Sequence, residues 1–109
     1  MSRDPVVDLA KLRDYCLSSE HPRGRHKARV FRSRLGLTAS DAELLRSALL
    51  NAAQRHRRGL IHGERDAFGQ RFILDFQMTT EMGTAIIRSG WIVPTGEQVM
   101  RFITCYVLN

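Results

Sequence analysis

Chemically useful side chains are concentrated in residues 20–27, which read Glu-His-Pro-Arg-Gly-Arg-His-Lys. Pro22 and Gly24 favour a loop that leads into a helix, and the free amides at a helix N-terminus attract phosphate. His21 supplies an imidazole, the group that enzymes use most often for general acid–base catalysis, and fixed cations surround it. RNA cleavage without a metal ion requires a base for the 2′-hydroxyl, cations for the phosphorane charge and an acid for the leaving oxygen. The segment therefore predicts phosphate chemistry, with His21 as general base or acid.

An alternative interpretation gives the same residues structural roles. His21 would then be a loop residue that hydrogen-bonds a helix end, and Lys27 a solvated side chain near a helix start. The sequence leaves both interpretations open.

Two hydroxyl groups on the last predicted strand, residues 99–108, extend the catalytic hypothesis. Thr104 and Tyr106 are two positions apart and share one strand face, which by alternation also includes Phe102. They could position a phosphate or donate a proton, although threonine and tyrosine also simply favour strands. Because the apolar helix positions must pack on the sheet, we expect the 21–27 segment to lie over this face.

Positive charge is concentrated in the first third of the chain. The 109 residues contain 17 Lys and Arg against 11 Asp and Glu, a net charge of +6. Residues 23–34 hold bases and no acid, and clustered cations favour polyanions through counterion release, so RNA is the expected partner. The alternative is a solvated basic helix face. The predicted phosphate- or RNA-binding residues are Arg23, Arg25, Lys27, Arg29 and, as a further cation, Arg71.

Several other classes of protein are not indicated. The chain has the length of a single domain, 1–109, in which we expect 1–6 to be an N-terminal extension. Its apolar runs fall far short of the ~20 residues that cross a bilayer, and no secretory signal is evident, so no membrane partner and a cytoplasmic location are expected. Two cysteines without CxxC spacing, and histidines without HExxH or HxxxH spacing, predict no metal and no cofactor.

Three helices are predicted in the first half of the chain. Asp8 caps the first, which ends near Ser18, and Gly36 ends a second over residues 25–35. The third and longest covers residues 40–57. For its start we favour a capping box of Ser40 with Glu43, and Thr38 with Asp41 competes for this role. A basic run at the end of this helix, residues 55–58, is explained by the helix dipole.

Strand-like alternation begins at Gly69. Phe72, Leu74, Phe76 and Met78 share one face, and further strands are predicted over 84–93 and 99–108, with Trp91 in the core. Residues 60–68 are predicted to form a loop, with at most a short edge strand at 60–62. Short turns between consecutive strands favour antiparallel pairing. The predicted fold is therefore α+β, with three helices packed on a meander of three or four antiparallel strands.

The order of several sequence blocks resembles the bacterial family DUF6883. Members share an opening pattern close to LRDYLL…HPxGRxKAxFF…LG and an ending close to PRxVTAYP. This sequence departs from the pattern at Phe68 and Phe72, where tyrosines are usual, at Arg71, where lysine is usual, and at Val107, where proline is usual. The matching blocks are 12–15 (LRDY), 19–31 (SEHPRGRHKARVF), 35–38 (LGLT), 68–72 (FGQRF), 89–92 (SGWI) and 100–106 (MRFITCY).

More distantly, a basic helical segment followed by a meander that ends in T-x-Y is similar to the barnase/EndoU/colicin/RelE-like group of metal-independent ribonuclease domains. Many of those are toxins. The resemblance implies a small toxin-type domain that cleaves or binds RNA, with His21, Arg25, Lys27, Thr104 and Tyr106 at its site and an acidic antitoxin or immunity protein as a partner. The alternatives are a non-catalytic protein whose basic face binds an acidic protein or nucleic acid, and an inactive regulator of a neighbouring enzyme.

Overall fold

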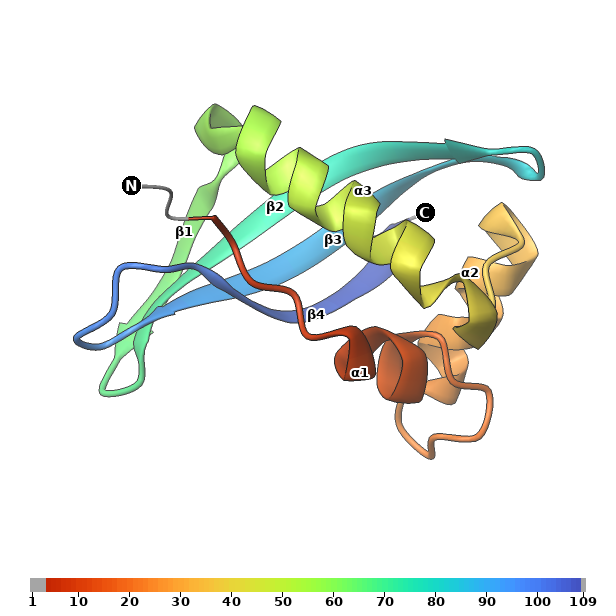
Figure 1. The fold of residues 1–109 in the computed structure, drawn as a ribbon, viewed down its shortest axis with the longest axis horizontal. Helices are drawn as coiled ribbons and strands as arrows, with labels where there is room; N and C mark the ends of the chain where they lie inside the picture. Colours follow the sequence, from red (N-terminus) through yellow and green to blue (C-terminus); the bar gives the residue numbers. More distant parts are fainter. Residues whose placement is uncertain (1–3, 109) are drawn as a thin grey trace.

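The computed structural model describes residues 4–108 and places the helices mostly before the strands, which form one antiparallel meander in the order β1-β2-β3-β4 (Figure 1). This confirms the α+β class and the meander. The helical elements are α1 (Leu9–Lys11), a π-helical turn (Leu12–Cys16), α2 (Arg25–Leu35), a 3-10 turn (Ala39–Asp41), α3 (Ala42–Arg55) and a second 3-10 turn (Arg57–Gly59). The strands are β1 (Ile61–Asp66), β2 (Gly69–Thr80), β3 (Gly83–Pro94) and β4 (Arg101–Leu108).

One face of the sheet is covered by α3, which crosses it diagonally (Figure 1). The predicted alternation of β2 is confirmed, because Leu74, Phe76 and Met78 are buried on this face. Trp91 of β3 is fully buried, as expected, and its ring packs edge-on against Phe102 at 5.5 Å. The core therefore lies between this face and the helical elements, and the π-helical turn and α2 contribute to it as well as α3.

The two long helices follow their sequence signals closely. The predicted bounds of α2 are confirmed, and Gly36 ends it with a φ of 69°, a left-handed conformation that glycine adopts without strain. At the start of α3 the preferred Ser40–Glu43 cap is wrong. Thr38 and Asp41 form the capping box around the 3-10 turn that precedes α3, and the Asp41 carboxylate accepts from the Thr38 amide at 2.8 Å.

The predicted loop at 60–68 is wrong, because most of it is β1. Every residue of β1 is exposed, so no apolar alternation marks it as a strand. A bulge lies between His62 and Arg65. A second irregularity, in the pairing of β3 with β4, places Phe102 on the buried face, away from Thr104 and Tyr106 with which alternation had grouped it.

The N-terminal segment lies along the outer edge of β4. Val6 forms a parallel bridge with Arg101, and Val7 is buried, so the predicted extension includes a residue, Val6, that pairs with the sheet edge. Residues 1–3 of that extension lie outside the described residues. No helix in the described range 4–108 is both long and apolar enough to cross a membrane.

Candidate active site

Lys27 is the centre of a small polar cluster that three elements build. Its Nζ donates to the hydroxyl oxygen of Tyr15, on the π-helical turn, at 3.1 Å, and to Oγ1 of Thr104, on β4, at 3.0 Å. Nζ also lies 5.8 Å from the ring centroid of Tyr106, within reach of a cation–π interaction. The structure thus brings Lys27 together with the Thr104/Tyr106 face, whereas the catalytic roles of these residues stay predictions.

A close backbone approach holds α2 in this position. A Cβ built on Gly24, just before α2, would lie 2.1 Å from the carbonyl oxygen of Tyr15. Only glycine lets the start of α2 sit this close to the π-helical turn. At the other end of α2, Thr80 Oγ1 donates to the carbonyl of Leu35 at 2.7 Å. Both ends of the helix are therefore fixed, and Lys27 is directed at β4.

A hollow of about 310 Å³ opens beside this cluster. It is lined by His26, Lys27, Val30, Tyr106 and Val107. An ammonium has three N–H donors, and Tyr15 and Thr104 accept two of those of Lys27. The third can serve a phosphate in this hollow, which we call the Lys27 hollow. His26, the second residue of α2, was not predicted as a site residue. It precedes Lys27 in the sequence and lines the same hollow.

His21 has a different environment from the one that a general base needs. Its Nδ1 accepts from the backbone amides of Arg23 and Gly24, both at 3.0 Å, so it holds the turn that precedes α2. Its ring stands edge-on to Tyr15, with the centroids 4.7 Å apart. This geometry matches the structural interpretation of His21, a loop residue hydrogen-bonded to a helix start.

The predicted RNA-binding arginines lie on the far side of α2 from Lys27. At about 100° per residue, positions 25, 29 and 32 share one side of the helix, and position 27 points the opposite way. Arg25, Arg29 and Arg32 line a separate groove of about 630 Å³. They make no ion pair within residues 4–108, so their charge is available to a ligand. Arg25 therefore does not lie beside Lys27 at one phosphate-binding site. Arg23 is exposed on the turn that precedes α2.

Arg71, the further cation that we expected, is paired elsewhere. Its guanidinium binds Asp66 in the β1–β2 hairpin, and β2 is two strands away from β4. Arg88 of β3 is the cation beside Tyr106: Asp75, Arg88 and Tyr106 are paired in one row across β2, β3 and β4. Arg88 makes two hydrogen bonds of 2.9 Å to Asp75, which, with a smaller contribution from Tyr106, raise the pKa of its guanidinium. Its one sequence signal is a charge inside an otherwise apolar strand.

Two buried thiols lie behind Thr104. Cys16 and Cys105 are free and fully buried, and Cys16 Sγ is 3.9 Å from Thr104 Oγ1. A hydrogen bond from Cys105 lowers the pKa of Cys16 from its ordinary 9.0 to about 6, against the opposing effect of burial, with smaller help from Thr104 and Lys27. Burial raises the pKa of Cys105. A thiolate at Cys16 would therefore support the Lys27–Thr104 contact from beneath.

Comparison with known proteins gives the family. The model described as "Domain of unknown function (DUF6883)" matches residues 3–109. The chain belongs to the DUF6883 family. No curated protein sequence matches it. Within this DUF6883 domain, sequence blocks far apart meet at Lys27, since one block supplies Gly24 and Lys27 and the last supplies Thr104 and Tyr106.

The fold has a counterpart among solved structures. It is similar to a chain of the contact-dependent growth inhibition toxin–immunity protein complex from Klebsiella pneumoniae 342, with a TM-score of 0.72 and 18% identity. The match covers 94% of this chain and 99% of that chain. This likeness shows that the two chains share a fold over almost their whole length.

No group of three or more His, Cys, Asp or Glu side chains that could hold a metal ion is found within residues 4–108.

Proposed function

We propose that this DUF6883 domain is a toxin-type domain that cleaves RNA at the Lys27 hollow without a metal ion. The observation that carries the proposal is the position of the Lys27 ammonium, held by two hydroxyl oxygens at the edge of a hollow that an imidazole and a phenol also line. The shared fold with a chain of a toxin–immunity protein complex supports the toxin class.

In this proposal the scissile phosphate binds to the third N–H of Lys27. Tyr15 and Thr104 position the ammonium, which stabilises the negative charge that develops on the phosphorane. Arg88 supplies a second positive charge next to Tyr106, and Asp75 fixes the direction of its guanidinium. These groups are in place before substrate arrives, which is the condition under which such charges are most effective.

Proton transfer falls to the two side chains that line the hollow with Lys27. His26 takes the proton from the 2′-hydroxyl as that oxygen attacks phosphorus. Tyr106 gives a proton to the 5′-oxygen as the P–O bond breaks, which leaves a 2′,3′-cyclic phosphate and a 5′-hydroxyl end. General acid–base catalysis of this kind contributes about 10²–10⁴ in rate.

The arginine groove on the far side of α2 would bind a neighbouring stretch of the same RNA. Arg25, Arg29 and Arg32 are spaced along one helix side, and Thr38 and Ser40 add hydroxyls across the groove. Contacts of this kind fix the position of an RNA backbone without reading its sequence.

A second candidate function is binding without catalysis. The net charge of +6 favours an acidic partner, and the structural counterpart comes from a complex that includes an immunity protein. In this case the basic surfaces would bind an acidic protein of the antitoxin or immunity type, and the Lys27 cluster would be structural.

The test is cleavage of a labelled RNA in EDTA by the wild type and by Lys27→Met. We expect Lys27→Met to reduce the rate by about 10²–10³, as for the loss of a preorganised transition-state contact. Lys11→Met is the matched control, because Lys11 is the only other lysine and its Nζ donates to the carbonyl of Phe102 outside the hollow. A second pair of variants is compared in the same assay. We expect Arg88→Gln to cleave RNA more slowly than the wild type, and Arg71→Gln to cleave it at the wild-type rate. Cleavage that requires a divalent ion, or no cleavage of any RNA by the folded protein, would refute the proposal.

A further inference from the structure

Half of β2 has a free edge. The pairing of β1 with β2 ends at Ile61 and Ile73, yet β2 continues to Thr80. Within residues 4–108, the part of β2 from Leu74 to Thr80 pairs only with β3, so its main-chain groups on the other side have no strand partner there. An exposed strand edge of this kind is a template for a further strand.

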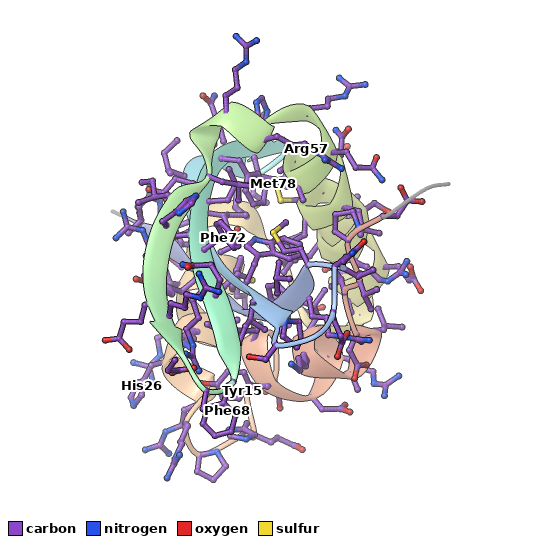
Figure 2. The ribbon with its side chains drawn as sticks, turned by 90° about the vertical axis from the view of Figure 1, so that its left-hand side faces the viewer. Tyr15, His26, Arg57, Phe68, Phe72 and Met78 are labelled. Carbon is purple, nitrogen blue, oxygen red and sulfur yellow. The ribbon has the colours of Figure 1, made fainter. Side chains whose placement is uncertain are left out.

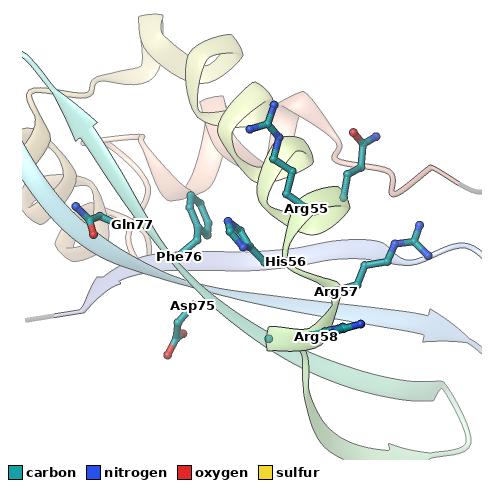
Figure 3. A pocket seen from close by; sticks show the side chains of 9 residues that line it. Arg55, His56, Arg57, Arg58, Asp75, Phe76 and Gln77 are labelled. Atoms are coloured by element: carbon teal, nitrogen blue, oxygen red, sulfur yellow. The ribbon is translucent and has the colours of Figure 1, made fainter.

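The free edge is flanked by α3, and the space between them is hollowed at both ends of the helix. At the C-terminal end of α3, a hollow of about 620 Å³ lies against residues 75–77 of β2 (Figure 3). At the N-terminal end, a hollow of about 400 Å³ lies against residues 78–80. We call the whole path along residues 75–80 the β2-edge groove.

The two ends of the β2-edge groove differ in chemistry. The first is basic, with Arg55, His56, Arg57 and Arg58 around it (Figure 3). The three arginines make no ion pair within residues 4–108. The second end has more apolar side chains, although Asp41 and Glu81 also line it. It is lined by Met78 and by two side chains that are unusually exposed for their type, Leu44 at 53% and Met82 at 69%.

We propose that the β2-edge groove binds an extended acidic segment of a partner protein, which adds a strand to β2. Its main chain would pair with the open edge, its carboxylates would contact Arg55, Arg57 and Arg58, and an apolar side chain would cover Leu44 and Met82. Strand addition combines main-chain hydrogen bonds with pockets for side chains in this way.

Three observations favour this occupant. A protein segment can pair with a row of strand amides and carbonyls and also cover an apolar end, whereas RNA phosphates match only the arginines. A second copy of this chain would carry the same net charge of +6 and be repelled. At the basic end the one lining carboxylate, Asp75, is already bound by Arg88, so it does not repel an acidic ligand strongly. The other two carboxylates of the groove, Asp41 and Glu81, line the second hollow and not the one with the three arginines.

The groove is separate from the Lys27 hollow. Arg57 lies at the opposite end of the molecule from Tyr15 and His26 (Figure 2). The inference therefore does not rest on RNA cleavage, and a partner in the groove would leave the Lys27 hollow open.

The experiment is an NMR titration of isotope-labelled protein with a synthetic peptide as long as the free edge. The peptide is acetylated and amidated, with alternating glutamate and valine in one half and alternating threonine and leucine in the other. We expect saturable shifts confined to the residues that line the groove, which are Leu44, residues 55–58 and residues 75–82. The same peptide with alternate amides N-methylated cannot pair as a strand and should lose these shifts, a comparison that needs no protein variant.

Charge-matched variants complete the test. Arg55→Glu/Arg57→Glu should weaken peptide binding about tenfold, because two attractive contacts become repulsive. Arg29→Glu/Arg32→Glu makes the same change in net charge on the other groove and should alter binding by no more than about twofold. Equal binding of the N-methylated peptide, shifts elsewhere, no binding by a protein shown to be folded, or displacement of the peptide by a single-stranded oligoribonucleotide would each overturn the proposal.

Discussion

The ammonium nitrogen of Lys27 lies 3.0 Å from the hydroxyl oxygen of Thr104, although 77 positions separate the two residues. The contact depends on where α2 starts, because Lys27 is the third residue of that helix. The start is set by the π-helical turn of residues 12–16, which carries Tyr15, and by the lack of a side chain at Gly24. A π-helical turn is often retained at a functional site, and here it delivers one of the two oxygens that hold Lys27.

Gly24 gives the first prediction. In Gly24→Ala the new methyl group would lie 2.1 Å from the Tyr15 carbonyl oxygen, so the start of α2 must move away from the turn. We expect a loss of about 1–3 kcal/mol in the free energy of unfolding, as for an overpacked site, together with slower RNA cleavage. Urea unfolding and a cleavage assay measure the two effects. Gly59→Ala is the control, because its methyl group would meet only ordinary contacts at 3.5 Å and beyond. Equal stability of Gly24→Ala and wild type would contradict the argument.

The two histidines of the 20–27 segment give the second prediction. His26→Ala should slow cleavage by about 10²–10⁴ and leave stability unchanged, because His26 is exposed and lines the hollow. His21→Ala should instead lower stability by about 1 kcal/mol, because two backbone amides lose their acceptor.

A rescue variant separates these roles. His21→Asn keeps a side-chain acceptor near the turn and should recover most of the stability, as asparagine does at helix starts. Thermal unfolding and cleavage rates are compared for all three variants. If His21→Ala abolishes cleavage at unchanged stability while His26→Ala is active, His21 is the base and our assignment of His26 is wrong.

Cys16 gives a prediction about pH. Its pKa in the folded protein is about 6, below its ordinary value of 9.0, so the unfolded chain binds the thiol proton more tightly. This contribution to stability is complete above pH 9, decreases as the pH falls, and is lost below about pH 6. Because the pKa of Cys105 is raised, its thiol changes the pH dependence of unfolding mainly above the ordinary pKa of a thiol. The change below that pH is therefore assigned to Cys16. The free energy of unfolding from urea titrations should therefore rise less steeply between pH 6 and 9 in Cys16→Ser than in the wild type. Identical slopes would show that Cys16 stays protonated.

Much of the fold could be predicted from the sequence, because its signals are local. The apolar spacing of residues 25–35 with Gly36 behind them gives α2, and the alternation after Gly69 gives β2. β1 could not be predicted in the same way, since all six residues are exposed and its pairing is a tertiary event. The two competing caps of α3 are two positions apart in the sequence, and only the extended backbone of Thr38 decides between them.

The site was harder to predict than the fold. Lys27, Thr104 and Tyr106 could be grouped, because their helix and strand must pack together. His21 was favoured over His26, because the sequence does not show that the Nδ1 atom of His21 is occupied by the amides of Arg23 and Gly24. Arg25 was grouped with Lys27 by sequence proximity, but the helical repeat separates them. The sequence shows Arg88 as a charged residue in an otherwise apolar strand. Its neighbours, Asp75 and Tyr106, follow only from the register of β3 with β2 and β4.

The separation of Arg25, Arg29 and Arg32 from Lys27 gives the last prediction. If these arginines bind RNA phosphates away from the cleaved bond, replacing all three by glutamine should weaken RNA binding and reduce its salt dependence. For a single strand, three lost phosphate contacts flatten the slope of log affinity against log salt by about 2. The rate of cleavage at saturating RNA should stay the same, because the Lys27 hollow on the other side of α2 is intact. Binding is measured by fluorescence anisotropy over a salt series, and cleavage by single-turnover kinetics.

Lys27→Met should show the reverse pattern. We expect a large loss in the rate of cleavage, and a change of less than about 1 in the slope of log affinity against log salt. An unchanged slope in the triple variant would place the RNA elsewhere, and a lost saturating rate would mean that both surfaces contact the reacting phosphate.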